Sequence, residues 1–318
     1  MKAADDGPRI GLALGSGSAR GWAHIGVIRE LNHLGITPHV VCGTSIGALV
    51  GGLYAAGHLD SLESWIRRLD WREILRYLDV TLLMGGGFVE GRRLIDFFRR
   101  EMGDQPIESL TTPFAAVATD LATGQEVWFR DGSLLDAIRA SFALPGLFTP
   151  VHLEGRWLVD GGLVNPVPVS VCRALGADVV IAVNLNGDVV GKHLRRTVAQ
   201  PVVSESKRAE ATLIEKWSRE LKQRTNSLVT QLFESSAGTP GLFDVVAGSI
   251  NIMQHRITRS RMAGDPPDIV LTPRLAHIGL MEFDRADEAI KEGGASARRA
   301  SHVLQDLVAA NHSGGART

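Results

Sequence analysis

The sequence is poor in cysteine and contains no long apolar run. Its 318 residues include two cysteines, Cys42 and Cys172, and both lie in apolar stretches. Two such cysteines argue against a disulfide framework and predict buried thiols in a reducing compartment. No stretch reaches the ~18 uncharged apolar residues expected of a membrane span. We therefore expect the protein to meet any membrane from the aqueous side.

An excess of charge of either sign is also missing. Lys and Arg together number 34 and Asp and Glu 35, which gives a formal net charge of -1. Nucleic-acid-binding surfaces usually carry a positive surplus, so we expect no nucleic-acid partner. Residues 1–8 are polar and acidic and lack the apolar core of a secretory signal. We expect a flexible N-terminus and a cytoplasmic location, with any membrane contact peripheral and at the inner face.

Strands and helices alternate in the first half of the chain. An apolar run at 10–14, ending in glycine and serine, is typical of a buried strand. Residues 22–34 carry apolar side chains at helical spacing, 40–42 form a second apolar run, and 46–56 a second helix pattern. This order favours parallel pairing with right-handed crossovers. The sequence therefore predicts a three-layer α/β fold with one mainly parallel central sheet.

The rest of the chain supplies further elements of the same fold. The predicted strands are 114–118, 126–129, 157–159, 179–183 and 269–271, and the predicted helices are 134–142, 167–175, 244–262 and 284–309. A polar segment at 188–241 has a mostly helical pattern. We predict a single domain over 9–310, with this segment as an excursion from the sheet, and a disordered tail at 311–318.

The most specific local motif is Gly43-Thr44-Ser45-Ile46-Gly47, a G-x-S-x-G pattern between an apolar strand and an apolar helix. Flanking glycines allow the tight strand-to-helix turn that lifts a serine hydroxyl clear of a sheet. The start of the following helix favours developing negative charge. The motif is consistent with a nucleophilic serine, and also with a glycine-flanked turn whose serine has no role.

A second motif, from Gly15 to Gly21, lies between the first strand and the first helix and has the sequence GSGSARG. Its row of backbone amides could cradle an anion. A dinucleotide pyrophosphate is one candidate, although Arg20 stands where the third glycine of G-x-G-x-x-G belongs. A nucleotide P-loop would need a Gly-Lys-Ser/Thr ending that is absent. An oxyanion hole served by the amides of Gly17 and Ser18 is the third candidate, and an ordinary helix-start loop is the fourth.

The third motif, Asp160-Gly161-Gly162, follows a predicted strand. Glycines after a carboxylate let a ligand or backbone approach closely, so the carboxylate can point into a cleft. The tripeptide alone is common, and its usual role is to form a turn. Its significance depends on the two motifs that precede it.

In this order and spacing, the three motifs resemble the patatin-like phospholipase family. The resemblance is strongest to the bacterial branch, which is similar to the catalytic domain of neuropathy target esterase. It spans roughly residues 9–183 and includes further matching stretches at 118–124 and 140–146. A weaker match lies at 278–287. It implies a patatin-like fold for the α/β domain.

The resemblance also implies roles for individual residues. Ser45 would be the nucleophile and Asp160 its partner in a catalytic dyad, without a necessary histidine. The oxyanion hole falls on Gly17 and Ser18. The supporting loop residues are Gly15, Arg20 and Gly21, and the turn around the nucleophile is formed by Gly43 and Gly47. Ser16 and Ser18 stand where glycines are more usual, so the loop angles must suit a side chain.

The implied activity is hydrolysis of a phospholipid, lysophospholipid or other fatty-acyl ester, with no metal or organic cofactor. Asp160 would take the proton of Ser45 as it attacks, which requires a sheltered carboxyl with a raised pKa. The alternatives are acyl transfer to an acceptor other than water, a regulatory or adaptor protein with vestigial catalysis, and a nucleotide-binding protein.

Two further features remain open from the sequence. His24 is the histidine nearest the predicted oxyanion loop, and it could pack near the loop or act as a base. Residues 78–89 combine three glycines with apolar side chains, so they could form a flap over a lipid or an ordinary buried loop. The arginines that follow could face anionic headgroups or solvent: Arg92, Arg93, Arg99 and Arg100.

Overall fold

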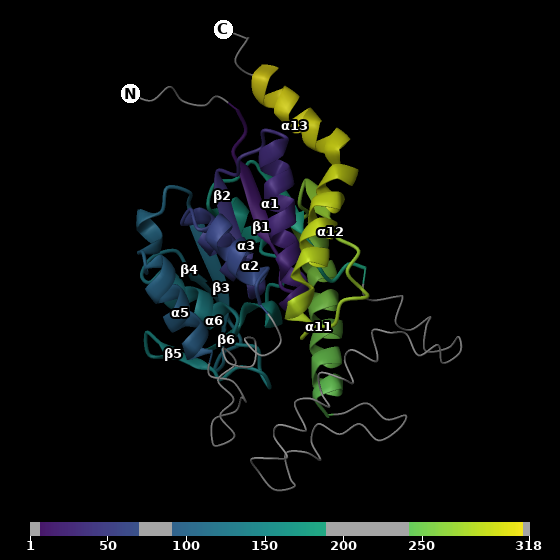
Figure 1. Cartoon of the computed structure of the whole chain (residues 1–318). Helices are drawn as coiled ribbons and strands as arrows, with labels where there is room; N and C mark the ends of the chain where they lie inside the picture. The colour runs from purple at the N-terminus through teal and green to yellow at the C-terminus, as the bar shows by residue number, and fades with distance from the viewer. Residues whose placement is uncertain (1–6, 70–90, 189–241, 314–318) are drawn as a thin grey trace, which may run out of the picture.

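The computed structural model describes residues 7–69, 91–188 and 242–313 (Figure 1). The predicted flap at 78–89 and nearly all of the polar segment at 188–241 lie outside these residues. Most of the predicted flexible N-terminus and part of the predicted tail also lie outside them. Those predictions therefore stay untested.

The described chain folds around one eight-stranded sheet with the order β5-β6-β3-β2-β1-β7-β8, and β4 pairs with β3 as well. Strands β3, β2, β1, β7 and β8 run parallel, whereas β4, β5 and β6 join antiparallel. The prediction of a mainly parallel sheet is confirmed. The strands are β1 (Ile10–Leu14), β2 (Val40–Thr44), β3 (Phe114–Asp120), β4 (Glu126–Phe129), β5 (Val151–Leu153), β6 (Arg156–Asp160), β7 (Val179–Val183) and β8 (Ile269–Leu271).

Helices cover both faces of the sheet, which gives the three layers (Figure 1). Because successive strand residues point to opposite faces, Leu12 and Val41 pack into the larger core and Ala13 and Cys42 into the smaller one. The larger core contains side chains of α1 (Ala23–His33), α2 (Ile46–Ala55), α3 (Leu59–Ile66), α5 (Arg92–Met102), α6 (Leu134–Ser141) and α12 (Ala286–Arg299). The smaller core contains α7 (Val169–Ala174), and Met262 of α11 (Leu242–Gly264) packs against it.

Strands β2 and β6 lie end to end along one edge of β3. Ala116 and Val117 of β3 pair with both β2 and β4, and Ala118 and Thr119 pair with both β4 and β6. A strand has only two edges, so β2 and β6 share one edge and β4 occupies the other. Because β2 runs parallel and β6 antiparallel to β3, their carboxyl ends face each other at this junction.

Small residues allow α1 and α12 to pack closely. A Cβ added to Gly26 of α1 would lie 1.9 Å from the carbonyl oxygen of Ile290, and one added to Gly293 would lie 2.0 Å from that of Ala23. The prediction of one helix over 284–309 is wrong, because α12 ends at Arg299 and α13 (Ser301–Ser313) begins after Ala300. The free, buried thiols of Cys42 and Cys172 confirm the prediction made from their apolar surroundings.

Candidate active site

The turn between β2 and α2 holds Ser45 in a strained backbone conformation, with φ 58° and ψ -124°. Side chains rarely adopt positive φ, and such strain is often found at functional sites. A Cβ on Gly43 would lie 2.3 Å from the carbonyl oxygen of Gly47, and one on Gly47 would lie 2.1 Å from that of Leu14. Both glycines are therefore required by the close packing of this turn.

The Ser45 hydroxyl donates a hydrogen bond of 2.6 Å to Oδ2 of Asp160. Asp160 ends β6 and is fully buried. Its other carboxylate oxygen, Oδ1, accepts a 2.7 Å hydrogen bond from the amide of Gly162, and its backbone carbonyl accepts one from the Thr119 hydroxyl. The carboxylate is thus fixed with one oxygen directed at the serine.

Burial raises the pKa of Asp160 to about 6, although the hydrogen bonds from Ser45 and Gly162 act in the opposite direction. A buried carboxylate loses hydration, which disfavours its charged form. A pKa near 6 leaves the group mostly ionised at neutral pH while making it a stronger base than an exposed aspartate. This arrangement suits proton transfer from a serine hydroxyl.

The glycine-rich loop presents two free amides to the same region. Most of its amides donate to backbone carbonyls, namely those of Gly15, Ser16, Ala19 and Arg20. Within the described residues, the amides of Gly17 and Ser18 make no hydrogen bond, and both residues line the cavity that contains Ser45. The loop therefore has the free donors that an oxyanion would require.

Serine at position 18 is accommodated despite its backbone conformation. Ser18 has φ 51°, in the left-handed region that favours glycine. Its hydroxyl donates a 2.6 Å hydrogen bond to the carbonyl of Leu280, and the amide of Ala19 donates to the same oxygen. Contact with the segment around Leu280 thus supports a conformation that a side chain seldom adopts.

The buried side chains of Arg20 and His24 stabilise this loop through hydrogen bonds to backbone carbonyls. The buried Arg20 donates from Nε to the carbonyl of Ile278 at 2.8 Å, and the fully buried His24 donates from Nε2 to the carbonyl of Gly15 at 2.8 Å. Burial lowers the pKa of His24 to about 4, so its ring is neutral at physiological pH. His24 therefore packs behind the loop, one of the two interpretations that the sequence left open.

Two residues that the sequence analysis did not single out also contact this site. Ser141, the last residue of α6, accepts a 2.9 Å hydrogen bond from the amide of Ser45 and donates at 2.6 Å to the carbonyl of Val117. Gln254, on α11, accepts a 2.9 Å hydrogen bond from the Ser16 hydroxyl. Ser141 lies within the stretch 140–146 that matched the family pattern, which was its only signal, whereas Gln254 had none.

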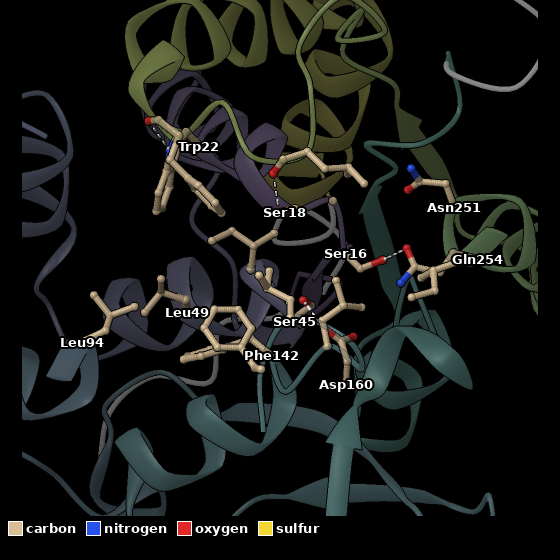
Figure 2. A pocket seen from close by; sticks show the side chains of 18 of the residues that line it. Ser16, Ser18, Trp22, Ser45, Leu49, Leu94, Phe142, Asp160, Asn251 and Gln254 are labelled. Carbon is tan, nitrogen blue, oxygen red and sulfur yellow. Dashed lines mark hydrogen bonds between the residues drawn. The ribbon is translucent and has the colours of Figure 1, made fainter. Parts of the chain in front are cut away.

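A cavity of about 1030 Å³, open mouth included, lies over Ser45 and Asp160 (Figure 2). Much of its wall is apolar and includes Trp22, Leu49, Trp65, Leu94, Phe142 and Phe148. Polar side chains of Ser16, Asn251 and Gln254 lie on another side of it. Such a cavity can take an apolar chain with its reacting group at the serine.

Among the arginines at 92, 93, 99 and 100, Arg99 lies in a cluster of surface ion pairs with Asp96, Asp104 and Asp136. The Arg99 guanidinium is thus paired with carboxylates of this chain, and its position does not require an anionic headgroup.

Comparison with known proteins agrees with the geometry. The family model described as patatin-like phospholipase matches residues 12–173. The chain belongs to the patatin-like phospholipase family. This confirms the resemblance inferred from the motifs, and the structure confirms the three-layer fold with its mostly parallel sheet.

Patatin-like relatives include proteins of the NTE family. An uncharacterised NTE family protein of Mycobacterium tuberculosis is 37% identical over 335 residues, which cover 94% of this chain and 92% of the relative. Another from the same organism is 30% identical over 318 residues, covering 95% of this chain and 48% of that protein. Lysophospholipase nte1 of Emericella nidulans is 35% identical over 194 residues, covering 56% of this chain and 12% of that protein.

None of the helices in the described part of this patatin-like chain is both long and apolar enough to cross a bilayer.

Proposed function

We propose that this protein is a lipid acyl hydrolase in which Ser45 is the nucleophile and Asp160 its general base. The observation that carries the proposal is the 2.6 Å hydrogen bond from the Ser45 hydroxyl to a buried carboxylate. The raised pKa of Asp160 and the free amides of Gly17 and Ser18 support it. The family and the nte1 relative favour fatty-acyl esters such as phospholipids or lysophospholipids.

The reaction follows from this arrangement in two halves. Asp160 takes the hydroxyl proton as Oγ of Ser45 bonds to the ester carbonyl carbon, and the amides of Gly17 and Ser18 stabilise the oxyanion. Collapse of the intermediate breaks the bond to the alcohol, which leaves with the proton from Asp160. Water then attacks the acyl-enzyme and gives its proton to Asp160. The second collapse releases the fatty acid, and the proton returns to Ser45.

The cavity supplies the preference for a lipid. Its apolar wall would bury an acyl chain, with each methylene transferred from water contributing about 0.8 kcal/mol. The substrate would come from a lipid surface, and the protein would bind that surface transiently. Hydrolysis requires no metal or organic cofactor in this scheme, because the base and the oxyanion donors come from the chain.

The proposal is tested by intact-mass measurement after exposure to an alkyl fluorophosphonate. We expect one adduct on the parent protein and on the Ser109→Ala variant, and none on Ser45→Ala. Ser109 is an exposed serine whose hydroxyl bonds locally to Pro106, so it is a matched control. An adduct that persists on Ser45→Ala, or no adduct on folded parent protein, would refute the role of Ser45.

A further inference from the structure

The orientation of the Gln254 side-chain amide is set by a chain of hydrogen bonds that starts at Arg20. A guanidinium can only donate, and Arg20 Nη1 lies 3.4 Å from the side-chain oxygen of Asn186. The nitrogen of Asn186 is then left to donate to Oε1 of Gln254 at 3.2 Å. The hydroxyl of Ser16 donates to the same oxygen at 2.9 Å. Nε2 of Gln254 therefore points away from Ser16 and Asn186.

The nitrogen of Gln254 lies beside the catalytic pair. A Cβ built on Gly162 would lie 2.4 Å from Nε2 and 2.9 Å from Oδ1 of Asp160. Gln254 is 4% exposed and lines the cavity, and within the described residues Nε2 has no hydrogen-bond partner. Because Nε2 is not sealed off from the cavity, a ligand or water there can accept its hydrogen bond. Figure 2 shows the amide nitrogen on the side of Asp160.

The cavity has two chemically different sides (Figure 2). Leu49, Leu94 and Phe142 lie to one side of Ser45, and Asn251 and Gln254 lie on the other. Among the described residues that line the cavity, Asp160 is the only one with an ionisable acid or base. Recognition on the polar side would thus depend on uncharged hydrogen bonds.

We infer that Gln254 lies in the leaving-alcohol subsite and donates from Nε2 to a hydroxyl oxygen of a glycerol-like alcohol. This inference rests on the proposed function and assigns the two ends of the ester to the two sides of the cavity. The acyl chain lies along Leu49, Leu94 and Phe142, and the hydroxyl-bearing alcohol lies against α11. Hydrogen-bond donors placed in this way give selectivity between alcohols, because an alcohol without the hydroxyl leaves the donor unpaired.

The test compares 1-monooleoylglycerol with methyl oleate in the same detergent mixed micelles. The two esters share the acyl chain and differ in the hydroxyls of the alcohol. For Gln254→Leu we expect the ratio of kcat/KM values, glycerol ester over methyl ester, to fall about three- to tenfold, the size of one lost hydrogen bond. Gln254→Glu keeps an acceptor for Ser16 and Asn186 but loses the donor, so its ratio should fall as well. Ser249→Ala, an exposed change on the same helix, should keep the parent ratio.

The fluorophosphonate adduct separates this inference from the proposed function. That reagent expels fluoride and carries no hydroxylated alcohol, so labelling of the parent and of the Ser249→Ala control reports the reactivity of Ser45 without a leaving alcohol at Gln254. An unchanged ratio in both variants, or equal losses on the two esters, would overturn the inference and leave Gln254 a support for the loop. A parent protein that is not labelled would refute the proposed function itself.

Discussion

Ser45 and Asp160 lie 115 residues apart in sequence, yet the serine hydroxyl meets the carboxylate at 2.6 Å. The contact follows from the sheet. Thr44, the last residue of β2, pairs with Val117, and Asp160, the last residue of β6, pairs with the next residue of β3. Two strands that end head to head on one edge therefore place Ser45 and Asp160 together. The antiparallel branch of the sheet thus completes the proposed catalytic pair.

The pH dependence of acylation should follow the ionisation of Asp160. Burial raises the pKa of this group to about 6, and only the ionised form can accept the Ser45 proton. We expect the rate of fluorophosphonate labelling to rise about tenfold per pH unit below pH 6 and to level off above it. The rate is measured by mass spectrometry between pH 4.5 and 8.5. A rate that continues to rise to pH 8.5 would show that another group controls acylation.

Ser141 should matter through the backbone of Ser45. Ser141→Ala leaves the amide of Ser45 and the carbonyl of Val117 without their shared partner, which should cost about 1–3 kcal/mol of unfolding free energy. A small displacement of the nucleophile should also lower kcat about tenfold or more, with little change in KM. Urea denaturation and steady-state kinetics check both effects, with Ser109→Ala as the control. Parent-like kcat would show that the turn holding Ser45 does not depend on this contact.

His24 should influence acid stability more than catalysis. In the folded protein its pKa is lowered from 6.5 to about 4 by burial, so below pH 6.5 the unfolded chain binds a proton that the folded chain excludes. Stability is therefore lost as pH falls from 6.5 toward 4, by about 3 kcal/mol in full. His24→Gln can still donate to Gly15 and does not titrate.

We expect His24→Gln to keep most of the labelling rate and to gain stability relative to the parent as pH falls from 7 to 4. The measurement is urea denaturation of both proteins across this range, in which the contribution of Asp160 is common to both. A labelling rate more than a hundredfold lower in His24→Gln would instead make His24 part of the proton-transfer machinery.

The contact between α1 and α12 gives a pair of opposite glycine predictions. Gly26→Ala would place Cβ 1.9 Å from the carbonyl oxygen of Ile290, so the two helices must separate and the fold should lose stability. For Gly248 of α11, no atom of the described part of the chain lies within 4 Å of an added Cβ. Gly248→Ala should therefore stabilise the helix by about 0.5–1 kcal/mol. Thermal unfolding of both variants measures this, and destabilisation by Gly248→Ala would contradict the packing described.

The sequence predicted the parallel part of the fold better than the antiparallel part. Apolar runs predicted the parallel strands β1, β7 and β8 at their observed bounds. Of the antiparallel strands, β4 was also predicted at its bounds, but β5 was not predicted. β5 has three residues, too few to show a periodic pattern, and no local pattern reports that β6 pairs antiparallel with β3. The predicted C-terminal helix is interrupted at Ala300, where the sequence has neither the glycine nor the proline that commonly marks a helix end.

Some residues of the candidate site could be predicted from the sequence and others could not. Ser45 and Asp160 could be named because each lies in a short motif with a recognisable order along the chain. Gln254 could not, because its contact with Ser16 spans 238 positions and glutamine on a helix has no local signature. The orientation of its amide depends on Asn186 and Arg20, a relationship that exists only in three dimensions.

The role of Asp160 as the base is tested by the rate of fluorophosphonate labelling of Asp160→Asn at pH 8, measured together with the stability of the variant. The variant removes the base and also a buried charge. Because the pKa of Asp160 is raised from 3.8 to about 6, the parent loses stability as pH rises from about 4 through 6, by about 3 kcal/mol in full. We predict that Asp160→Asn is labelled at least a hundredfold more slowly than the parent, yet is more stable at pH 8, with the gain disappearing near pH 4. A folded Asp160→Asn protein labelled at the parent rate would contradict the claim that Asp160 activates Ser45.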